Sequence, residues 1–248
     1  MDDPRTSRRR RGCTVVGKPN APAGAIRGVI FDMDGVLVES EPFIAGAAVA
    51  MFAEKGVAVH AKEFRPFIGM GEDRFLGGVA EARGVSLDMP ADKVRTYEIY
   101  LDLIRGRLEP LPGVAAFVGR CRDRGLRLAV ASSADRMKVE GNLGVLGLPP
   151  GTFEAVVVGE DIVRKKPAPD IFQEAARRLG LDPASCLVVE DAVSGVQAAK
   201  AAGSLCLGLT TSFAADVLTA AGADWTAEDL ASVPPGIIGD GPSSADSD

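Results

Sequence analysis

Short apolar runs alternate with longer stretches of helical periodicity along most of the chain, and this alternation limits the possible folds most. Five runs are long enough for a strand and too short for a helix, at residues 27–31, 126–131, 155–158, 186–189 and 205–209. Helical stretches separate the later runs, at residues 114–124, 135–146, 169–179 and 194–202. Because strands that alternate with helices form parallel sheets covered on both faces, the sequence predicts an α/β fold with a parallel sheet flanked by helices.

One stretch, residues 42–109, interrupts the alternation with helical patterns only. It follows the first apolar run directly. Pro42 opens its first helix and Gly56 follows the end of that helix, which is the usual asymmetry of helix termini. We expect an inserted all-helical cap here, next to a Rossmann-like core formed by residues 26–41 and 110–233. A length of 248 residues suits this arrangement, since it is long for one compact unit and short for two.

The two ends of the chain differ in composition from the part between them. Residues 1–25 are basic and then rich in Gly, Pro and Ala, and residues 234–248 are rich in Pro, Gly, Ser and Asp. Both are predicted to be disordered. The basic start also resembles an organelle transit peptide, although Asp2 and Asp3 depart from the acid-poor pattern of such peptides. A transit-peptide remnant and a simple disordered tail both stay open.

The overall composition argues against several classes of function. A formal net charge of -6 is unfavourable for a nucleic-acid-binding surface. No stretch approaches the roughly 18 unbroken apolar residues of a membrane span. The four cysteines lie far apart, without metal-site spacing, which favours free thiols in a reducing compartment. We therefore expect a soluble monomer whose partner is a small molecule.

Polar residues with the chemistry of a phosphate site stand where four of the apolar runs end or the next helix begins. In chain order they are Asp32, Asp34 and Gly35, then Ser132 and Ser133, then Lys166, and finally Glu190 and Asp191. The carboxyl ends of parallel strands share one edge of a sheet, so carboxylates there can form a magnesium site with positions open for water and phosphate. Hydroxyls and N–H groups before a helix can hold a phosphate, and a lysine can neutralise it. Each group alone has an ordinary explanation, namely a turn, a helix cap or a solvated charge. Four such groups in order are much rarer.

These four groups resemble the four ordered motifs of the haloacid dehalogenase superfamily, and the resemblance covers residues 26–211. The sequence is similar to the branch with a helical cap inserted after the first motif, which includes the β-phosphoglucomutase-like enzymes. The resemblance implies that Asp32 is the nucleophile and Asp34 the general acid and base. It also implies that Ser132 and Lys166 bind the phosphoryl group.

The same resemblance implies Mg²⁺ as the cofactor. Asp32, Asp191 and the backbone carbonyl of Asp34 would bind it, with Glu190 in or near that shell. True dehalogenases of the superfamily lack the second aspartate of the first motif. The presence of Asp34 therefore argues against dehalogenation and for phosphoryl transfer.

Two positions distinguish this chain from the mutases of that branch. Ile44 stands where the mutases have a histidine, and Glu72 stands where they have an arginine that grips a second phosphate. Water is then the expected acceptor of the phosphoryl group, so a phosphatase is favoured and a sugar phosphomutase is the alternative. Arg74 is a partial substitute for the missing arginine. The residues that we expect to contact the substrate are Gly35, Glu39, Ser40, Glu72, Arg74 and Ser133.

Residues 69–78 and 130–136 also resemble chloroplast proteins of plants and algae within this family. This resemblance implies a location in the chloroplast stroma, with the cytoplasm as the alternative. It also opens a different class of function, a binding or regulatory module without turnover. Because every catalytic position is present, we predict a magnesium-dependent phosphatase that hydrolyses a small phosphorylated metabolite, such as a sugar phosphate, through an aspartyl-phosphate intermediate.

Overall fold

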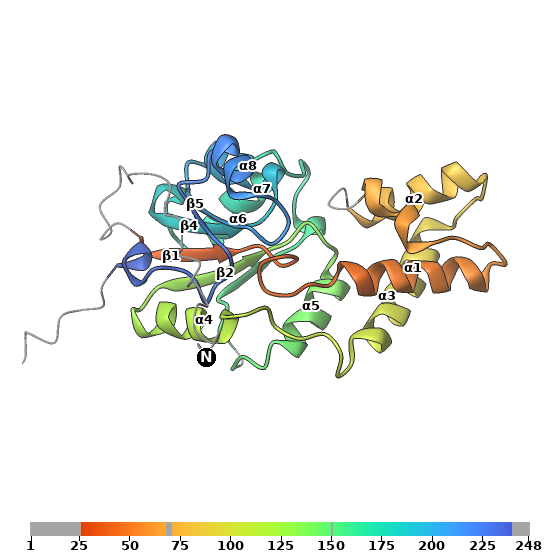
Figure 1. Cartoon of the computed structure of the whole chain (residues 1–248), viewed down its shortest axis with the longest axis horizontal. Helices are drawn as coiled ribbons and strands as arrows, with labels where there is room; N and C mark the ends of the chain where they lie inside the picture. The colour runs from red at the N-terminus through yellow and green to blue at the C-terminus, as the bar shows by residue number, and fades with distance from the viewer. Residues whose placement is uncertain (1–25, 68–70, 150, 240–248) are drawn as a thin grey trace, which may run out of the picture.

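The computed structural model describes residues 26–67, 71–149 and 151–239, and a six-stranded sheet forms its centre (Figure 1). The strands are β1 (Gly28–Phe31), β2 (Arg127–Ala131), β3 (Ala155–Val157), β4 (Cys186–Glu190), β5 (Leu205–Leu209) and β6 (Trp225–Ala227). Their order in the sheet is β3-β2-β1-β4-β5-β6, and every neighbouring pair is parallel. The predicted parallel α/β sheet is confirmed. The edge strand β6 goes beyond the prediction, because Thr226 interrupts it and acidic residues flank it, so no apolar run marks it.

Helices cover both faces of the sheet because successive residues of a strand point to opposite faces. Ile30 of β1 belongs to an apolar cluster with side chains of α6, α7 and α8, whereas its neighbours Val29 and Phe31 belong to a second cluster with side chains of α4 and α5. The two sets of helices lie on opposite sides of the sheet in Figure 1. Their bounds are α4 (Val114–Asp123), α5 (Arg136–Val145), α6 (Asp170–Arg178), α7 (Val193–Ala202) and α8 (Ala215–Ala221), with short 3-10 turns η4 (Gly159–Asp161) and η5 (Pro183–Ser185).

Between β1 and β2 the chain forms a separate group of helices, drawn on the right of Figure 1. We call it the cap lobe (residues 41–104). Its elements are α1 (Glu41–Glu54), η2 (Ala61–Glu63), η3 (Arg65–Phe67), α2 (Glu72–Arg83) and α3 (Met89–Ile104). Aromatic rings form its interior, since the ring of Phe64 lies 5.9 Å from that of Phe52 and 4.8 Å from that of Phe75. The all-helical insertion after the first strand is confirmed.

The cap lobe packs against α5 of the core through its helix α3. Tyr100 of α3 donates its hydroxyl hydrogen bond to Asn142 of α5. Lys93 of α3 forms an ion pair of 2.7 Å with Asp135, the residue before α5. Gly141 leaves room for the cap, because a Cβ there would lie 2.3 Å from a methyl group of a leucine of α3. Polar and apolar contacts together therefore fix where the cap lobe sits.

The segment that enters the cap lobe and the segment that leaves it lie next to each other. Val38, which follows the first strand, pairs with Pro110 in an antiparallel bridge. Next to it, the N–H of Leu111 donates to the carbonyl of Leu37 at 2.9 Å. The two crossings between core and cap are thus joined by backbone contacts.

The predicted disordered tail begins too early. A 3-10 turn, η6 (Pro235–Ile238), follows the last strand, and both Ile237 and Ile238 are buried in the larger apolar cluster. The Pro and Gly content favours disorder, but the two isoleucines gain more by leaving water than the short turn costs. The remaining predicted tails, residues 1–25 and 240–248, lie outside the described residues.

Two further expectations concern the described part of the chain. Cys121, Cys186 and Cys206 are free, as their wide spacing predicts, and all three are buried. None of the described helices is both long and apolar enough to cross a membrane.

Candidate active site

The candidate site lies where the strand order of the sheet reverses. β1 pairs with β2 on one side and with β4 on the other. Phe31, the last residue of β1, is level with Val189 of β4, so Asp32 and Glu190 leave the sheet side by side. In open parallel sheets, ligands bind outside the carboxyl ends of the strands at this point. The topology therefore brings the first and the fourth predicted groups together.

Lys166 joins the carboxylates of Asp32 and Glu190 in a buried cluster. Its Nζ lies 2.5 Å from Oδ1 of Asp32 and 2.6 Å from Oε1 of Glu190. Burial disfavours the charged form of Lys166, but the two carboxylates raise its pKa, so it is a cation at neutral pH. Burial raises the pKa of Asp32 against the opposing effect of Lys166, and the charge of Glu190 adds to the rise. One ammonium group thus faces more than one buried carboxylate.

Asp191 packs its carboxylate onto the turn at Gly35. A Cβ on Gly35 would lie 2.0 Å from Oδ2 of Asp191, and the φ of Gly35 is +73°, so both space and backbone conformation require glycine. Ser212 donates to Oδ2 of Asp191, and Thr211 donates to the carbonyl of Gly35 at 2.6 Å. The N–H of Gly35 itself donates to the carbonyl of Val38 at 2.8 Å. That N–H is used inside the turn, and Gly35 is not among the residues that line the cavity described below, so its contact with a substrate stays a prediction.

Side chains hold both carboxylate oxygens of Asp34. The buried Ser40 donates its hydroxyl to Oδ1, and Nζ of Lys138 lies 2.7 Å from Oδ2. Lys138 comes from α5 and is buried, yet the carboxylates around it raise its pKa and keep it charged. The hydroxyl of Ser40 is engaged with Asp34 here, and its predicted contact with the substrate stays a prediction.

A cavity of about 1100 Å³ lies over these groups, between the sheet edge and the cap lobe. The predicted site residues that line it are Asp32, Asp34, Glu39, Glu72, Ser132, Ser133, Lys166, Glu190 and Asp191. Ser132 is buried, and its Oγ accepts the N–H of Ala134 at 3.2 Å, which fixes the loop ahead of α5. The structure therefore brings most of the predicted set to one cavity.

Glu72 and Arg74, the two cap residues expected to contact the substrate, lie in different surroundings. Glu72 begins α2 and lines the cavity, and burial raises the pKa of its carboxyl group. Arg74 pairs with Glu81 at 2.9 Å, stacks 5.2 Å from the ring of Phe67, and is not among the residues that line the cavity. Residues two apart on a helix do not share a face, so only one of the pair can point into the cavity. Residues 68–70 of the predicted cap loop lie outside the described residues.

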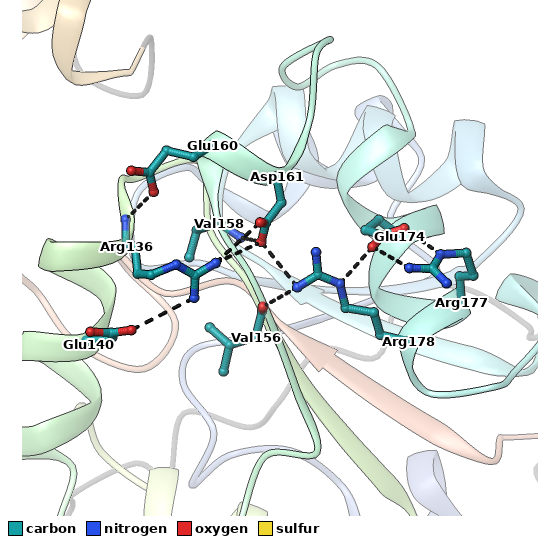
Figure 2. Close-up of polar contacts among 9 residues, drawn as sticks. All are labelled: Arg136, Glu140, Val156, Val158, Glu160, Asp161, Glu174, Arg177 and Arg178. Atoms are coloured by element: carbon teal, nitrogen blue, oxygen red, sulfur yellow. Dashed lines mark hydrogen bonds and ion pairs between the residues drawn. The ribbon is translucent and has the colours of Figure 1, made fainter.

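An ion-pair network braces the loop that carries Lys166 (Figure 2). Its hub is Asp161 of η4, which accepts from Arg136 at 3.3 Å and lies 3.2 Å from Nη1 of Arg178. Asp161 also accepts the N–H of Val158 at 3.1 Å, immediately after β3. The start of α5 and the end of α6 are thereby tied together across the loop between β3 and α6.

The donor groups at the sheet edge suit a hard cation. Burial, and then the charges of Glu190 and Asp32, raise the pKa of Asp191, which means that an added positive charge would be favourable here. Among the described residues, no three acidic, histidine or cysteine side chains are grouped to hold a metal ion. The Glu190 carboxylate accepts hydrogen bonds from Lys166 at 2.6 Å and from the N–H groups of Asp191 and Ala192 at 2.8 Å. A cation would therefore use the carboxylates of Asp32 and Asp191 together with backbone and water oxygens, a set that Mg²⁺ accepts.

Several residues contribute to the site without having been predicted. Thr211 and Ser212 lie in the loop just after β5, so the rule of polar residues at strand ends could have found them. Lys165 and Arg65 line the cavity from a loop of the core and from η3 of the cap. Lys138 meets Asp34 across 104 positions of sequence. The cap-dependent contacts carry no local sequence signal, because they depend on how the cap lobe docks.

Comparisons with known proteins agree with this geometry. The family model described as haloacid dehalogenase-like hydrolase matches residues 26–203. Suppressor of Quenching 1, a chloroplastic protein of Arabidopsis thaliana, is 44% identical over 213 residues, which are 85% of this chain and 20% of that relative. The chain thus spans about a fifth of the length of that protein.

Two further relatives are covered over most of their length. Hexitol phosphatase B of Escherichia coli is 32% identical over 182 residues, which are 71% of this chain and 80% of that enzyme. The crystal structure of CbbY from Rhodobacter sphaeroides in complex with phosphate superimposes with a TM-score of 0.74 at 28% identity, over 83% of this chain and 95% of that one. Because the family model matches most of its length, the chain belongs to the haloacid dehalogenase-like hydrolase family.

Proposed function

We propose that the protein is a magnesium-dependent phosphatase that hydrolyses a small phosphorylated metabolite, such as a sugar phosphate, through an aspartyl-phosphate on Asp32. The position of Asp32 carries the proposal. Its carboxylate is buried at the end of the central strand, lies 2.5 Å from Nζ of Lys166, and faces the cavity. A carboxylate can attack a phosphate ester only where nearby positive charge offsets their repulsion, and Lys166 supplies such a charge.

The reaction would proceed in two transfers of the phosphoryl group. In the first, an oxygen of Asp32 bonds to phosphorus while the bond from phosphorus to the leaving oxygen breaks, and Asp34 gives that oxygen a proton. In the second, water bonds to phosphorus, Asp34 takes a proton from the water, and the carboxylate of Asp32 is released. Ser132 and Lys166 would hold the phosphoryl oxygens during both transfers. Mg²⁺ bound by Asp32, Asp191 and the carbonyl of Asp34 would add charge that offsets the repulsion between nucleophile and phosphate.

The walls of the cavity support a hydroxyl-rich substrate and water as acceptor. Glu39, Glu41 and Glu72 line it and present carboxylate oxygens that can accept hydrogen bonds from hydroxyl groups. Ile44, also in the wall, is apolar and cannot exchange a proton with a sugar hydroxyl as a histidine can. The name of hexitol phosphatase B points to the same class of substrate. The chloroplastic relative supports a location in the chloroplast stroma.

A phosphate-release screen over sugar phosphates, phosphoglycolate and nucleotides, with magnesium and with a chelator, tests the proposal. We expect release of phosphate from at least one sugar phosphate, only with magnesium, and none from Asp32→Asn. The matched control is Asp102→Asn, since that side chain is 71% exposed and is not among the residues that line the cavity; it should behave as the wild type. A folded wild type that releases no phosphate with magnesium, or an active Asp32→Asn, would refute the proposal. Isomerisation of a sugar phosphate without free phosphate would indicate a mutase instead.

A further inference from the structure

We propose that Lys138 is a positioning residue that orients the Asp34 carboxylate toward the leaving group and couples it to the cap lobe. The inference rests on the proposed function, because it assigns Lys138 to the proton-transfer step of that reaction. It concerns a residue that belongs to none of the four sequence groups and reaches the site from α5.

Lys138 lies between carboxylates from two parts of the molecule. Its side chain is 5% exposed, and its Nζ lies 2.7 Å from Oδ2 of Asp34 and 4.0 Å from Oε1 of Glu72. The first carboxylate belongs to the loop after β1 and the second to the first turn of α2 in the cap. A buried ammonium group is unfavourable unless anions compensate for its lost hydration, and these two carboxylates compensate. The ammonium group therefore favours an arrangement in which core loop and cap both stay close to α5.

The contacts of Asp34 show why its orientation depends on Lys138. Ser40 holds Oδ1 from the same loop, and Lys138 holds Oδ2 from a helix of the core. With Ser40 alone, the carboxylate could still turn about that one hydrogen bond. Without Lys138, Asp34 and Glu72 would also face each other with no cation between them, and like charges at short range repel. Loss of Lys138 is therefore expected to release the Asp34 carboxylate from the orientation that it has at the wall of the cavity.

A second lysine provides a matched control for the docking of the cap. Lys93 of α3 lies 2.8 Å from Asp73 in the cap and 2.7 Å from Asp135 at the start of α5. It bridges cap and core as Lys138 does, but its ion pairs do not involve Asp34. If Lys138 only docked the cap, Lys93→Met and Lys138→Met would have the same effect on the reaction.

The test compares kcat/KM for an alkyl ester, β-glycerophosphate, with that for p-nitrophenyl phosphate, in the full chain with magnesium. The value of kcat/KM reports steps up to transfer of the phosphoryl group to Asp32. An alkoxide needs a proton to leave, whereas nitrophenolate leaves without one. We expect Lys138→Met to lower the ratio of the two kcat/KM values (alkyl over aryl) by about tenfold to 10²-fold, the lower part of what general acid catalysis contributes. Lys138→Arg, which keeps the charge, should recover much of the ratio, and Lys93→Met should leave it unchanged.

A double variant distinguishes the loss of the Asp34 contact from misfolding of the protein. Lys138→Met with Glu72→Gln removes the repulsion between the two carboxylates and still leaves Asp34 without its partner, so its ratio should fall as well. An equal loss with both esters, a rise of KM alone, or the same change of ratio in Lys93→Met would overturn the proposal. These results differ from failure of the proposed function, in which the wild type itself would release no phosphate from any ester.

Discussion

Gly195→Ala is a single-methyl change that tests how the site is held together. Gly195 lies in the first turn of α7, and a Cβ there would lie 1.7 Å from Oε1 and 1.9 Å from Cδ of Glu190. No real pair of atoms tolerates such a separation, so the Glu190 carboxylate must move. That carboxylate accepts from Lys166 at 2.6 Å and from the N–H groups of Asp191 and Ala192 at 2.8 Å. The substitution therefore displaces a buried acceptor of three hydrogen bonds.

The size of the expected loss in stability follows from those hydrogen bonds. A hydrogen bond to a charged group contributes roughly 1.5–3 kcal/mol, and losing the geometry of one or two of them costs about 2–5 kcal/mol. Replacing glycine by alanine in a helix returns up to ~1 kcal/mol. We expect a net loss of about 1–4 kcal/mol in the free energy of unfolding, which for a protein of this size lowers Tm by roughly 3–15 °C.

Gly119→Ala is the matched control. Gly119 lies inside α4, and a Cβ there would meet nothing within 4 Å, so this variant should be about 0.5–1 kcal/mol more stable than the wild type. Urea denaturation followed by circular dichroism measures both. If Gly195→Ala were as stable as Gly119→Ala, the argument that the Glu190 carboxylate clasps Lys166 and the start of α7 would be wrong.

Three other substitutions probe separate parts of the structure. Asp161→Ala should lower stability by about 1–2 kcal/mol in urea denaturation, because it removes the hub of the loop network. Burial opposes the charge of Asp161, but a backbone N–H and two arginines lower its pKa below 3.8. The stabilisation by Asp161 is therefore complete at neutral pH and is lost on acidification through that lowered pKa. A stability difference between Asp161→Ala and the wild type that persists below this pKa would contradict the reasoning. Tyr100→Phe should cost roughly 1–3 kcal/mol, since it removes the hydrogen bond of the buried Asn142, and an unchanged melting temperature would count against this. Ser40→Ala should lower kcat more than it raises KM, because the hydroxyl holds Asp34 inside the site; a change in KM alone would assign it to substrate binding.

Sequence patterns locate the strands of the central sheet closely. The run at residues 205–209 coincides with β5, and the run at 186–189 differs from β4 by one residue. These runs are apolar throughout because both faces are buried, which gives them clear ends. The edge strand β6 (Trp225–Ala227) has no such contrast, because Thr226 interrupts it and Asp224 precedes it. At the other extreme, Ile237 and Ile238 are buried although their neighbours have the composition of a disordered tail.

In the candidate site, too, sequence identifies some residues and misses others. Asp32, Ser132 and Asp191 are found by sequence because the fold itself carries the carboxyl ends of parallel strands to one edge. Sequence does not single out Lys138, and Arg74, expected near the substrate, pairs with Glu81 and does not line the cavity, since these positions depend on helix direction and on packing. Local patterns predict which residues leave a strand, and tertiary packing decides which distant side chains meet them.

The backbone bridge between Val38 and Pro110 has a consequence for how enzymes of this architecture can diversify. The two crossings lie next to each other, so the core sheet does not need the intervening residues to bring its first and second strands into register. A tight turn of a few residues is enough to join antiparallel neighbours. The cap lobe is thus a module that can be shortened, exchanged or replaced without rerouting the core. The cap lobe can therefore change while the residues at the carboxyl ends of β1 and β4 keep their places in the core.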